Sequence, residues 1–187
     1  RMAALQPKSP LPYLRMASAH LIAGEQAAAG DKLRKALELD PNLLEAQQGL
    51  ASLAMAAKKP EEALAIARTV QKQRPKEQVG YILEGDIHAA GKAWDQAAEA
   101  YRTGVKQSDS PELAIRLHNA LVGAGKKPDA DRWAADWTRS HPKDATFALY
   151  QGNQALGRNE LPESLRQFDR ALTLQPGNAI ALNNRAW

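Results

Sequence analysis

The chain contains no cysteine, few aromatic residues and no long apolar run, and these shortages exclude several kinds of site and of protein. Among its 187 residues cysteine is absent and only 5% are Phe, Trp or Tyr. Without cysteine there is no disulfide framework, no thiolate zinc site and no cysteine nucleophile. No apolar run approaches the roughly 18 residues that a membrane-spanning helix needs. A chain without cysteine suits cytosolic and oxidising compartments equally, so this absence does not choose a compartment.

The residues that are abundant favour a helical protein with a sizeable core. Apolar residues make up 44% and charged residues 25%, and this mixture, rich in alanine and leucine, disfavours disorder. The net charge is +4 and the pI is about 9.4. Nucleic-acid binders of this kind gather Lys and Arg in one stripe, whereas here basic residues are interspersed with Asp and Glu. We interpret them as solvated helix faces and expect no nucleic-acid partner.

Prolines recur along the chain at a fixed spacing. They lie 34 residues apart in two series, Pro7, Pro41 and Pro75, then Pro142 and Pro176. The gap between the two series is two repeats minus one residue, and Asp109 followed by Pro111 occupies the missing slot. A period of this length is the signature of a repeat protein and outweighs a reading as a single globular domain.

Each repeat contains two segments with helical apolar periodicity, joined by a short breaker. We expect helical hairpins over residues 11–23 with 26–39, 44–57 with 60–73, 78–90 with 94–107, 111–123 with 127–140, and 145–157 with 161–174. The corresponding repeats are 10–43, 44–77, 78–110, 111–144 and 145–178, with the end of a preceding repeat at 1–9 and the start of a further one at 179–187. In the breakers, Gly24, Gly91 and Gly125 are placed to adopt the backbone conformation that ends a first helix.

Small residues recur where the two helices of a hairpin must approach closely. The second helices carry them at Ala29, Ala63, Ala97, Ala130 and Ser164. The first helices carry an equivalent set at Ala17, Ala51, Gly85, Gly152 and Ala186. His118 takes this place in repeat four, and the sequence alone offers no reason for it.

A large and a small residue also alternate, three positions apart, on the second helices. The large residue comes first in repeats one, three and five, as Leu33/Ala36, Tyr101/Gly104 and Phe168/Ala171. The order is reversed in repeats two and four, as Ala67/Val70 and Ala134/Trp137. Residues three apart share a helix face, so the swap roughly conserves volume at the seam between neighbouring repeats. We therefore predict that Trp137 is buried.

Candidates for catalysis or metal binding are scarce. The four histidines are His20, His88, His118 and His141. They show no zinc-type spacing, and we interpret them as packing residues. No G-x-S-x-G, P-loop or H-E-x-x-H motif is present. We therefore expect a protein that is not an enzyme, with no catalytic residue, no metal and no cofactor.

Taken together, the repeats resemble the tetratricopeptide repeat family. Its pattern of a large residue, a small residue, alanine and an aromatic is matched in repeat three by Tyr81, Gly85, Ala97 and Tyr101, with Gly104 after them. Repeat one matches with Tyr13, Ala17, Ala29, Leu33, Ala36 and Pro41, and repeat five with Gly152, Ser164, Phe168, Ala171 and Pro176. The resemblance covers essentially the whole chain. It implies an all-α, right-handed superhelix of about five complete hairpins with partial repeats at both ends.

The resemblance also implies a function, the docking of a protein or peptide in a concave groove lined by the first helix of each hairpin. The ligand-facing positions of the family correspond here to Arg15, Ser18, Gln48, Ser52, Ile82, Asp86, Ile115, Arg116, Asn119, Leu149, Tyr150 and Asn153. Asn119 and Asn153 occupy one slot in successive repeats. They are placed to hydrogen-bond a peptide backbone, or they are solvated polar residues. The lysines of the family's carboxylate clamp are missing.

A narrower resemblance joins several stretches, among them L-P-Y-L-R-M-A-S-A-H-L-I-A-G at 11–24 and A-L-N-N-R-A-W at 181–187. They are similar to the long tetratricopeptide lipoproteins of the PEP-CTERM/exosortase system. That similarity implies a scaffold on the periplasmic side of a bacterial cell envelope, in exopolysaccharide production or protein sorting; a cytoplasmic location is the alternative. Because the chain begins at Arg1 inside a helical pattern, we expect a portion of a longer array.

Two other functions stay open beside protein docking. One is the guidance of an exported polysaccharide, which would need aromatic rings for sugar stacking, and the predicted groove offers only Tyr150. The other is self-association through the apolar residues of Ala179 to Trp187, a segment without a partner helix.

Overall fold

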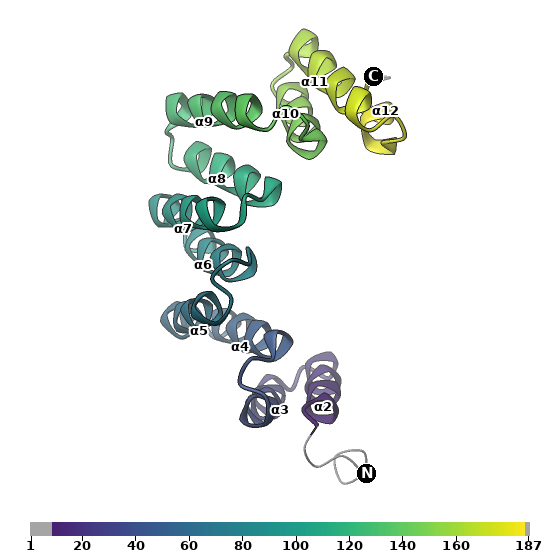
Figure 1. Ribbon diagram of the computed structural model, residues 1–187. Helices are drawn as coiled ribbons and strands as arrows, with labels where there is room; N and C mark the ends of the chain where they lie inside the picture. Colours follow the sequence, from purple (N-terminus) through teal and green to yellow (C-terminus); the bar gives the residue numbers. More distant parts are fainter. Residues whose placement is uncertain (1–8, 186–187) are drawn as a thin grey trace. The chain divides into compact units, whose positions relative to one another are not determined.

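The computed structural model describes residues 9–185, and every regular element in that range is an α-helix (Figure 1). The helices are α2 (Leu11–Ile22), α3 (Gln26–Leu39), α4 (Leu44–Ala56), α5 (Pro60–Gln73), α6 (Val79–Ala90), α7 (Trp94–Ser108), α8 (Pro111–Gly123), α9 (Lys127–Ser140), α10 (Ala145–Gly157), α11 (Leu161–Leu174) and α12 (Ala179–Arg185). The expected hairpins are confirmed to within one residue at each end. None of the described helices is long and apolar enough to cross a membrane.

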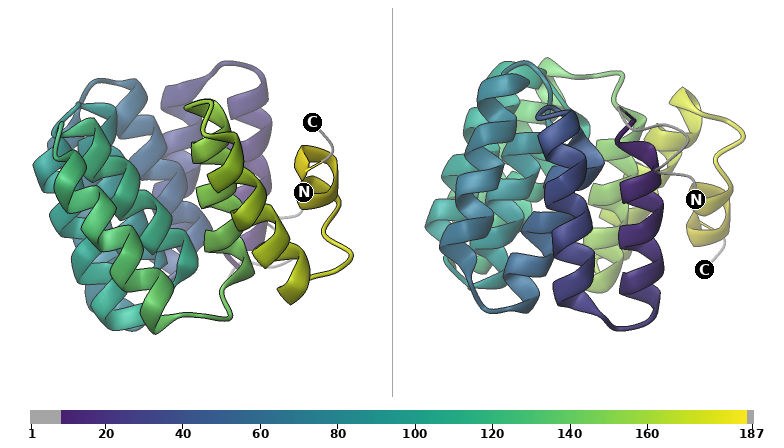
Figure 2. Two further views of the ribbon diagram at one scale, coloured as in Figure 1. Left: turned by 90° about the horizontal axis from the view of Figure 1, so that it is seen from above. Right: turned by 90° about the horizontal axis from the view of Figure 1, so that it is seen from below.

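The chain divides into two compact units, Arg1–Ser108 and Asp109–Trp187, and the boundary falls at the shortened repeat. Within the first unit, three hairpins follow one another, α2 with α3, α4 with α5 and α6 with α7. Within the second unit, α8 pairs with α9 and α10 with α11, and α12 packs on α11. The two helices of each hairpin pack on each other within their unit, as Figure 2 shows clearly for α2 and α3.

Each hairpin turns through one residue whose backbone is left-handed. These residues are Gly24 (φ 77°), Lys58 (φ 59°), Lys92 (φ 58°), Gly125 (φ 72°) and Asn159 (φ 60°). The expectation for Gly91 is wrong, since Gly91 has a φ of −82° and the left-handed residue is Lys92. The reason is positional: Gly91 is the C-cap of α6, and the left-handed conformation belongs to the residue after it.

The small residues lie where the expected close approaches occur. In the second helices, Ala29, Ala63, Ala97 and Ala130 are fully buried, and Ser164 is 2% exposed. The hydroxyl of Ser164 donates a hydrogen bond to the carbonyl oxygen of Gly152 at 3.0 Å, which satisfies a buried polar group. In the first helices, Ala17 and Ala51 are buried as well. Ala186 lies outside the described residues.

Packing inside the hairpins explains His118. In repeat three the small residue of the first helix faces a ring of the second, and a Cβ at Gly85 would lie 2.1 Å from Cε1 of Tyr101. In repeat four, Ala134 stands at the position of Tyr101. In this repeat the larger side chain, His118, is on the first helix, and it is only 7% exposed. The hairpin therefore keeps its volume although the two helices have exchanged large for small.

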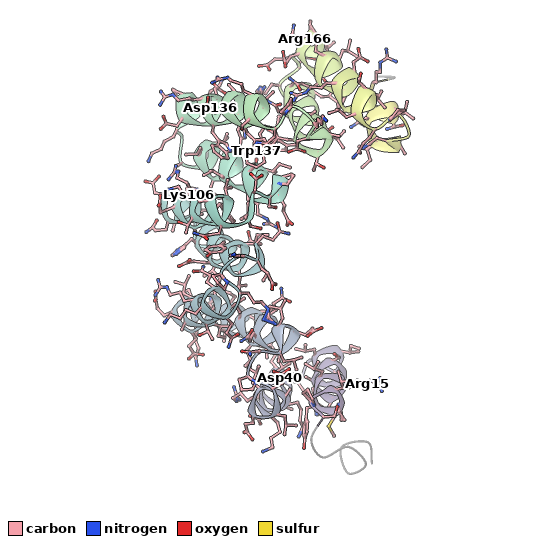
Figure 3. The ribbon with its side chains drawn as sticks, viewed as in Figure 1. Arg15, Asp40, Lys106, Asp136, Trp137 and Arg166 are labelled. Carbon is pink, nitrogen blue, oxygen red and sulfur yellow. The ribbon has the colours of Figure 1, made fainter. Side chains whose placement is uncertain are left out.

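The burial of Trp137 is confirmed, since its side chain is 2% exposed (labelled in Figure 3). Its ring stacks on His141 with centroids 3.6 Å apart, and Phe147 lies 6.1 Å away. The indole Nε1 donates a hydrogen bond to Oδ2 of Asp144 at 2.8 Å, while Oδ1 of Asp144 accepts from the amide of Phe147 and caps α10. Trp137 thus joins the second helix of repeat four to the first turn of repeat five.

Candidate functional site

The twelve residues predicted to face a ligand form what we call the first-helix surface, and none of them is fully buried. In the first unit, Arg15 and Ser18 lie on α2, Gln48 and Ser52 on α4, and Ile82 and Asp86 on α6. In the second unit, Ile115, Arg116 and Asn119 lie on α8, and Leu149, Tyr150 and Asn153 on α10. Each unit thus contributes six of the twelve residues.

In the first unit's set, Asp86 and Ser18 make internal hydrogen bonds. Oδ1 of Asp86 accepts from the hydroxyl of Tyr101 at 2.6 Å. The hydroxyl of Ser18 donates to the carbonyl oxygen of Leu14 on its own helix at 3.1 Å. These bonds hold the two side chains in place and leave less of their hydrogen-bonding capacity for a partner.

In the second unit, side chains link each first helix to the next. The hydroxyl of Tyr150 donates to Oδ1 of Asn119 at 2.7 Å. One repeat later, Nδ2 of Asn184 donates to Oδ1 of Asn153 at the same distance. In both asparagines the oxygen is engaged, while the amide nitrogen has no partner among the described residues. Each of these two exposed amide groups is thus held in its orientation by a side chain of the following first helix.

Beside this surface the second unit contains a polar cavity of about 220 Å³. It lies between the hairpins of repeats four and five, and its lining is His118, Asp131, Ala134, Ala135, Tyr150, Gln151, Gln154, Arg158 and Glu163. Tyr150 belongs to both the cavity and the first-helix surface. We call this space the α8–α11 cavity.

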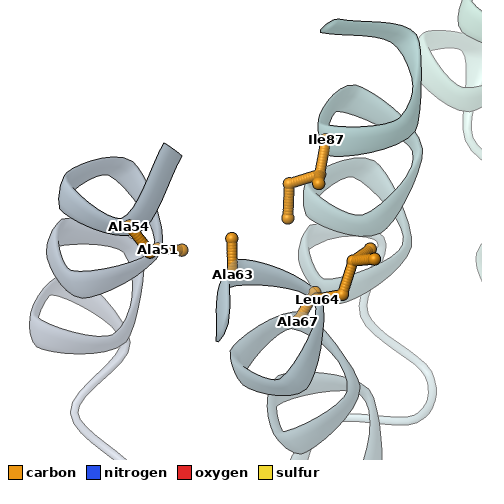
Figure 4. Close-up of a cluster of buried hydrophobic side chains, with 6 residues drawn as sticks. All are labelled: Ala51, Ala54, Ala63, Leu64, Ala67 and Ile87. Atoms are coloured by element: carbon orange, nitrogen blue, oxygen red, sulfur yellow. The ribbon is translucent and has the colours of Figure 1, made fainter. Parts of the chain in front are cut away.

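The corresponding positions one repeat pair earlier are filled with hydrocarbon. There, Leu64 and Ile87 are 5% and 4% exposed and belong to a buried cluster with Ala51, Ala54, Ala63 and Ala67 (Figure 4). In the α8–α11 cavity, Asp131 stands at the position of Leu64, and Gln154 at that of Ile87. The cavity is therefore the polar version of a site that the first unit closes by apolar packing.

Burial governs the ionisation of the two rings at the cavity. Burial lowers the pKa of His118 below its ordinary value of 6.5, the carboxylate of Asp131 partly opposes this effect, and Arg158 adds to it. Burial also raises the pKa of Tyr150 to about 12. Nδ1 of His118 lies 2.6 Å from the hydroxyl of Tyr150. Because that hydroxyl donates to Asn119, Nδ1 carries the imidazole proton and Nε2 is left as an acceptor.

The charged groups of the cavity differ in how far they are already paired. Arg158 donates two hydrogen bonds to Glu160, at 3.0 and 2.8 Å, and this pairing raises the pKa of Arg158. Glu163 is paired with Arg166 and accepts from Gln167. The side chains of Asp131 and Gln154 have no hydrogen bond to any described residue. The open groups of the cavity are therefore a carboxylate and an amide.

The remaining histidines have structural contacts. His20 and His88 are half-buried on their helices, and Nδ1 of His20 lies 2.5 Å from Oε2 of Glu25. His141 stacks on Trp137, and its Nε2 lies 2.8 Å from Oδ1 of Asp109. In the described part of the chain no three His, Asp or Glu side chains are grouped so that they could hold a metal ion.

The α8–α11 cavity was not predicted from the sequence, although the sequence contains a signal for it. Asp131 and Gln154 are polar at positions where the 34-residue register places Leu64 and Ile87 in the preceding repeats. Such a pair of polar residues is visible only when the repeats are aligned position by position. That they face one space depends on the packing of neighbouring hairpins.

Comparisons with known proteins agree with the helical hairpins. Two family models described as tetratricopeptide repeats match residues 20–87 and 116–179, which together form most of the chain. The chain belongs to the tetratricopeptide repeat family, whose arrays are typically non-enzymatic scaffolds for protein interactions. No curated protein sequence matches it.

Solved structures show the same fold. YrrB, described as a TPR protein with an unusual peptide-binding site, is 18% identical, with a TM-score of 0.55 over 100% of this chain and 96% of YrrB. PilF of Pseudomonas aeruginosa is 19% identical, with a TM-score of 0.59 over 94% of this chain and 80% of PilF. Yeast Tom70 is 15% identical, with a TM-score of 0.68 over 98% of this chain but only 40% of Tom70. The expected tetratricopeptide solenoid is thereby confirmed.

Proposed function

We propose that the protein docks an extended peptide segment of a partner protein on its first-helix surface. The observation that carries the proposal is the orientation of Asn119 and Asn153. Each amide oxygen is held by a side chain of the next first helix, at 2.7 Å in both cases. The NH₂ groups that remain are exposed donors one repeat apart. An extended peptide has carbonyl oxygens that suit such donors.

Three features support docking over other uses of the surface. Its members combine apolar, amide and charged side chains, as peptide-binding grooves do. Family membership favours a protein partner, and YrrB shows that the fold carries a peptide-binding site in a protein of the same class. Sugar stacking would require several exposed rings, whereas Tyr150 is the one aromatic residue among the twelve and is half-buried.

The test selects binding peptides from a displayed random library on the immobilised protein and measures their Kd by fluorescence anisotropy. We expect Asn119→Ala/Asn153→Ala to weaken binding by about tenfold or more, because each lost hydrogen bond costs about 0.5–1.5 kcal/mol. The matched control is Arg132→Ala/Arg139→Ala, at exposed positions on the second helix α9. Equal Kd values for both double variants would refute the proposed surface.

The cellular setting is a further proposal, supported by the sequence resemblance to PEP-CTERM-associated lipoproteins. In that setting the docked partner belongs to a protein-sorting or exopolysaccharide assembly on the periplasmic side of the envelope. Fractionation of the native organism with an antibody against residues 9–185 tests this location. Recovery of the protein in the cytoplasmic fraction would contradict it.

A further inference from the structure

We propose that the α8–α11 cavity is a specificity pocket that takes a basic side chain, arginine or lysine, of the docked peptide. This inference rests on the proposed function and adds to it the chemistry of one peptide position. The juxtaposition behind it is a carboxylate, two amides and a tyrosine ring around one small space.

The open groups of the cavity include three hydrogen-bond acceptors, beside the NH₂ donors of Gln151 and Gln154. Asp131 offers a carboxylate and Gln154 an amide, both without a partner among the described residues. Nε2 of His118 is a third acceptor, since Nδ1 is used in the contact with Tyr150. Guanidinium and ammonium groups carry only donors, five and three respectively. A basic side chain therefore matches the open groups better than a neutral or acidic one.

The balance of charge at the cavity also favours a cation. The one basic side chain in the lining, Arg158, is neutralised by its two hydrogen bonds to Glu160. The carboxylate of Asp131 interacts electrostatically with Arg158, but its side chain makes no hydrogen bond or ion pair within the described residues. The ring of Tyr150, at the cavity wall, provides a face on which a guanidinium can stack.

The size and place of the cavity suit one side chain rather than a separate small molecule. Its volume of about 220 Å³ is below the roughly 300–1,000 Å³ of pockets for drug-sized ligands. Tyr150 is shared with the first-helix surface and is hydrogen-bonded to Asn119. A peptide held by Asn119 thus lies next to a residue of the cavity wall.

The test uses N-acetyl-L-arginine N-methylamide and N-acetyl-L-lysine N-methylamide as probes, titrated into the ¹⁵N-labelled chain and followed by NMR. N-acetyl-L-citrulline N-methylamide is the control, because it keeps the shape of arginine without the charge. We expect Kd values on the order of millimolar for the basic probes, with shift changes centred on Asp131 and the side-chain amide of Gln154. Citrulline should bind at least about tenfold more weakly.

Three variants define the site. Asp131→Asn removes the charge with little change of shape, and we expect it to raise the Kd about tenfold. Asp131→Leu/Gln154→Ile introduces the apolar residues that the first unit has at these positions and should abolish binding, with far-UV circular dichroism as the check on folding. Asp129→Asn, an exposed carboxylate on the same helix outside the cavity lining, should leave the Kd unchanged.

The results separate this inference from the proposed function. Equal binding of arginine and citrulline, an unchanged Kd in Asp131→Asn, or no saturable shifts at the cavity would overturn the pocket. If Asn119→Ala/Asn153→Ala still weakens the binding of library peptides, the first-helix surface remains supported without the pocket. If instead Asp131→Asn weakens the basic probes while the asparagine variant leaves peptide binding intact, the pocket stands and the docking surface is wrong.

Discussion

Equivalent positions are apolar where repeats two and three meet in the first unit and largely polar where repeats four and five meet in the second. We call these two places the apolar seam and the polar seam. The five corresponding pairs are Ala51 and His118, Leu64 and Asp131, Ala67 and Ala134, Leu83 and Tyr150, Ile87 and Gln154. In the first unit these positions form a buried hydrocarbon cluster (Figure 4). In the second they line a polar cavity. The 34-residue repeat therefore specifies the helices and where they end. It does not specify whether the side chains between neighbouring hairpins are apolar or polar.

One polar contact between equivalent positions is kept at both seams. In the first unit, Nε2 of Gln71 donates to Oε2 of Glu84 at 2.6 Å. At the equivalent positions of the second unit, the hydroxyl of Thr138 donates to Oε1 of Gln151 at 3.1 Å. The helices of the two seams thus meet through the same pair of positions. The two seams differ both in their side chains and in their helix contacts, because α5 packs along α6, whereas in the second unit α10 contacts α8 more closely than α9.

Replacement of Trp137 should have the largest effect on the polar seam. Trp137→Ala is expected to lower the free energy of unfolding by about 3–5 kcal/mol, because it empties a buried site and removes the hydrogen bond to Asp144. Urea denaturation followed by circular dichroism measures this. Trp133→Ala, at a half-buried position on the same helix, should cost less. A loss below about 1 kcal/mol for Trp137→Ala would contradict the packing described here.

A polar substitution in the apolar seam should lower the free energy of unfolding by nearly as much. Leu64→Asp is expected to lower the free energy of unfolding by about 3 kcal/mol, since it removes buried hydrocarbon and places a charge among Ala67 and Ile87. The matched control is Leu165→Asp, at the same repeat position but 44% exposed, which should change stability by about 0.5 kcal/mol or less. If both variants lose the same free energy of unfolding, burial does not distinguish the two positions.

Conversion of the polar seam toward the apolar one should stabilise the protein. Asp131→Leu/Gln154→Ile fills the cavity with the pair found one repeat pair earlier, and we expect a gain of about 1–2 kcal/mol in the free energy of unfolding. Thermal and urea unfolding both measure it. A destabilised variant would mean that the larger His118 and Tyr150 leave no room for the pair.

The smallest expected effect concerns pH. The pKa of His118 is lowered by burial from 6.5, so below about pH 6.5 the unfolded chain takes up a proton that the folded chain resists, and stability falls as the pH falls. His118→Phe removes this site, and we expect a shallower loss of stability between pH 7.5 and 5.5 than in the wild type. Urea unfolding at both pH values measures the difference. An unchanged slope would show that His118 is not the responsible group.

Much of the fold was predictable from sequence because its causes are local. Helix ends follow from proline and small-residue spacing, and the expected hairpins agree with the structure to within one residue. The failure at Gly91 has a local cause too, since the left-handed residue is the next one, Lys92. Of the candidate site, the sequence predicted its helices and the shared slot of Asn119 and Asn153. It did not predict that Tyr150 and Asn184 hold their amide oxygens.

The sequence by itself determined the repeat length, the helix pairs and the slots that must stay small, because each depends on residues a few positions apart along one chain segment. Only the tertiary structure decided which helix of a hairpin contributes the larger side chain at their contact, as His118 on α8 and Ala134 on α9 show. It alone also brought Asp131 of α9 and Gln154 of α10 to one cavity. Those outcomes depend on side chains from different helices sharing one volume, and close packing makes the choice at each position depend on its neighbours in space.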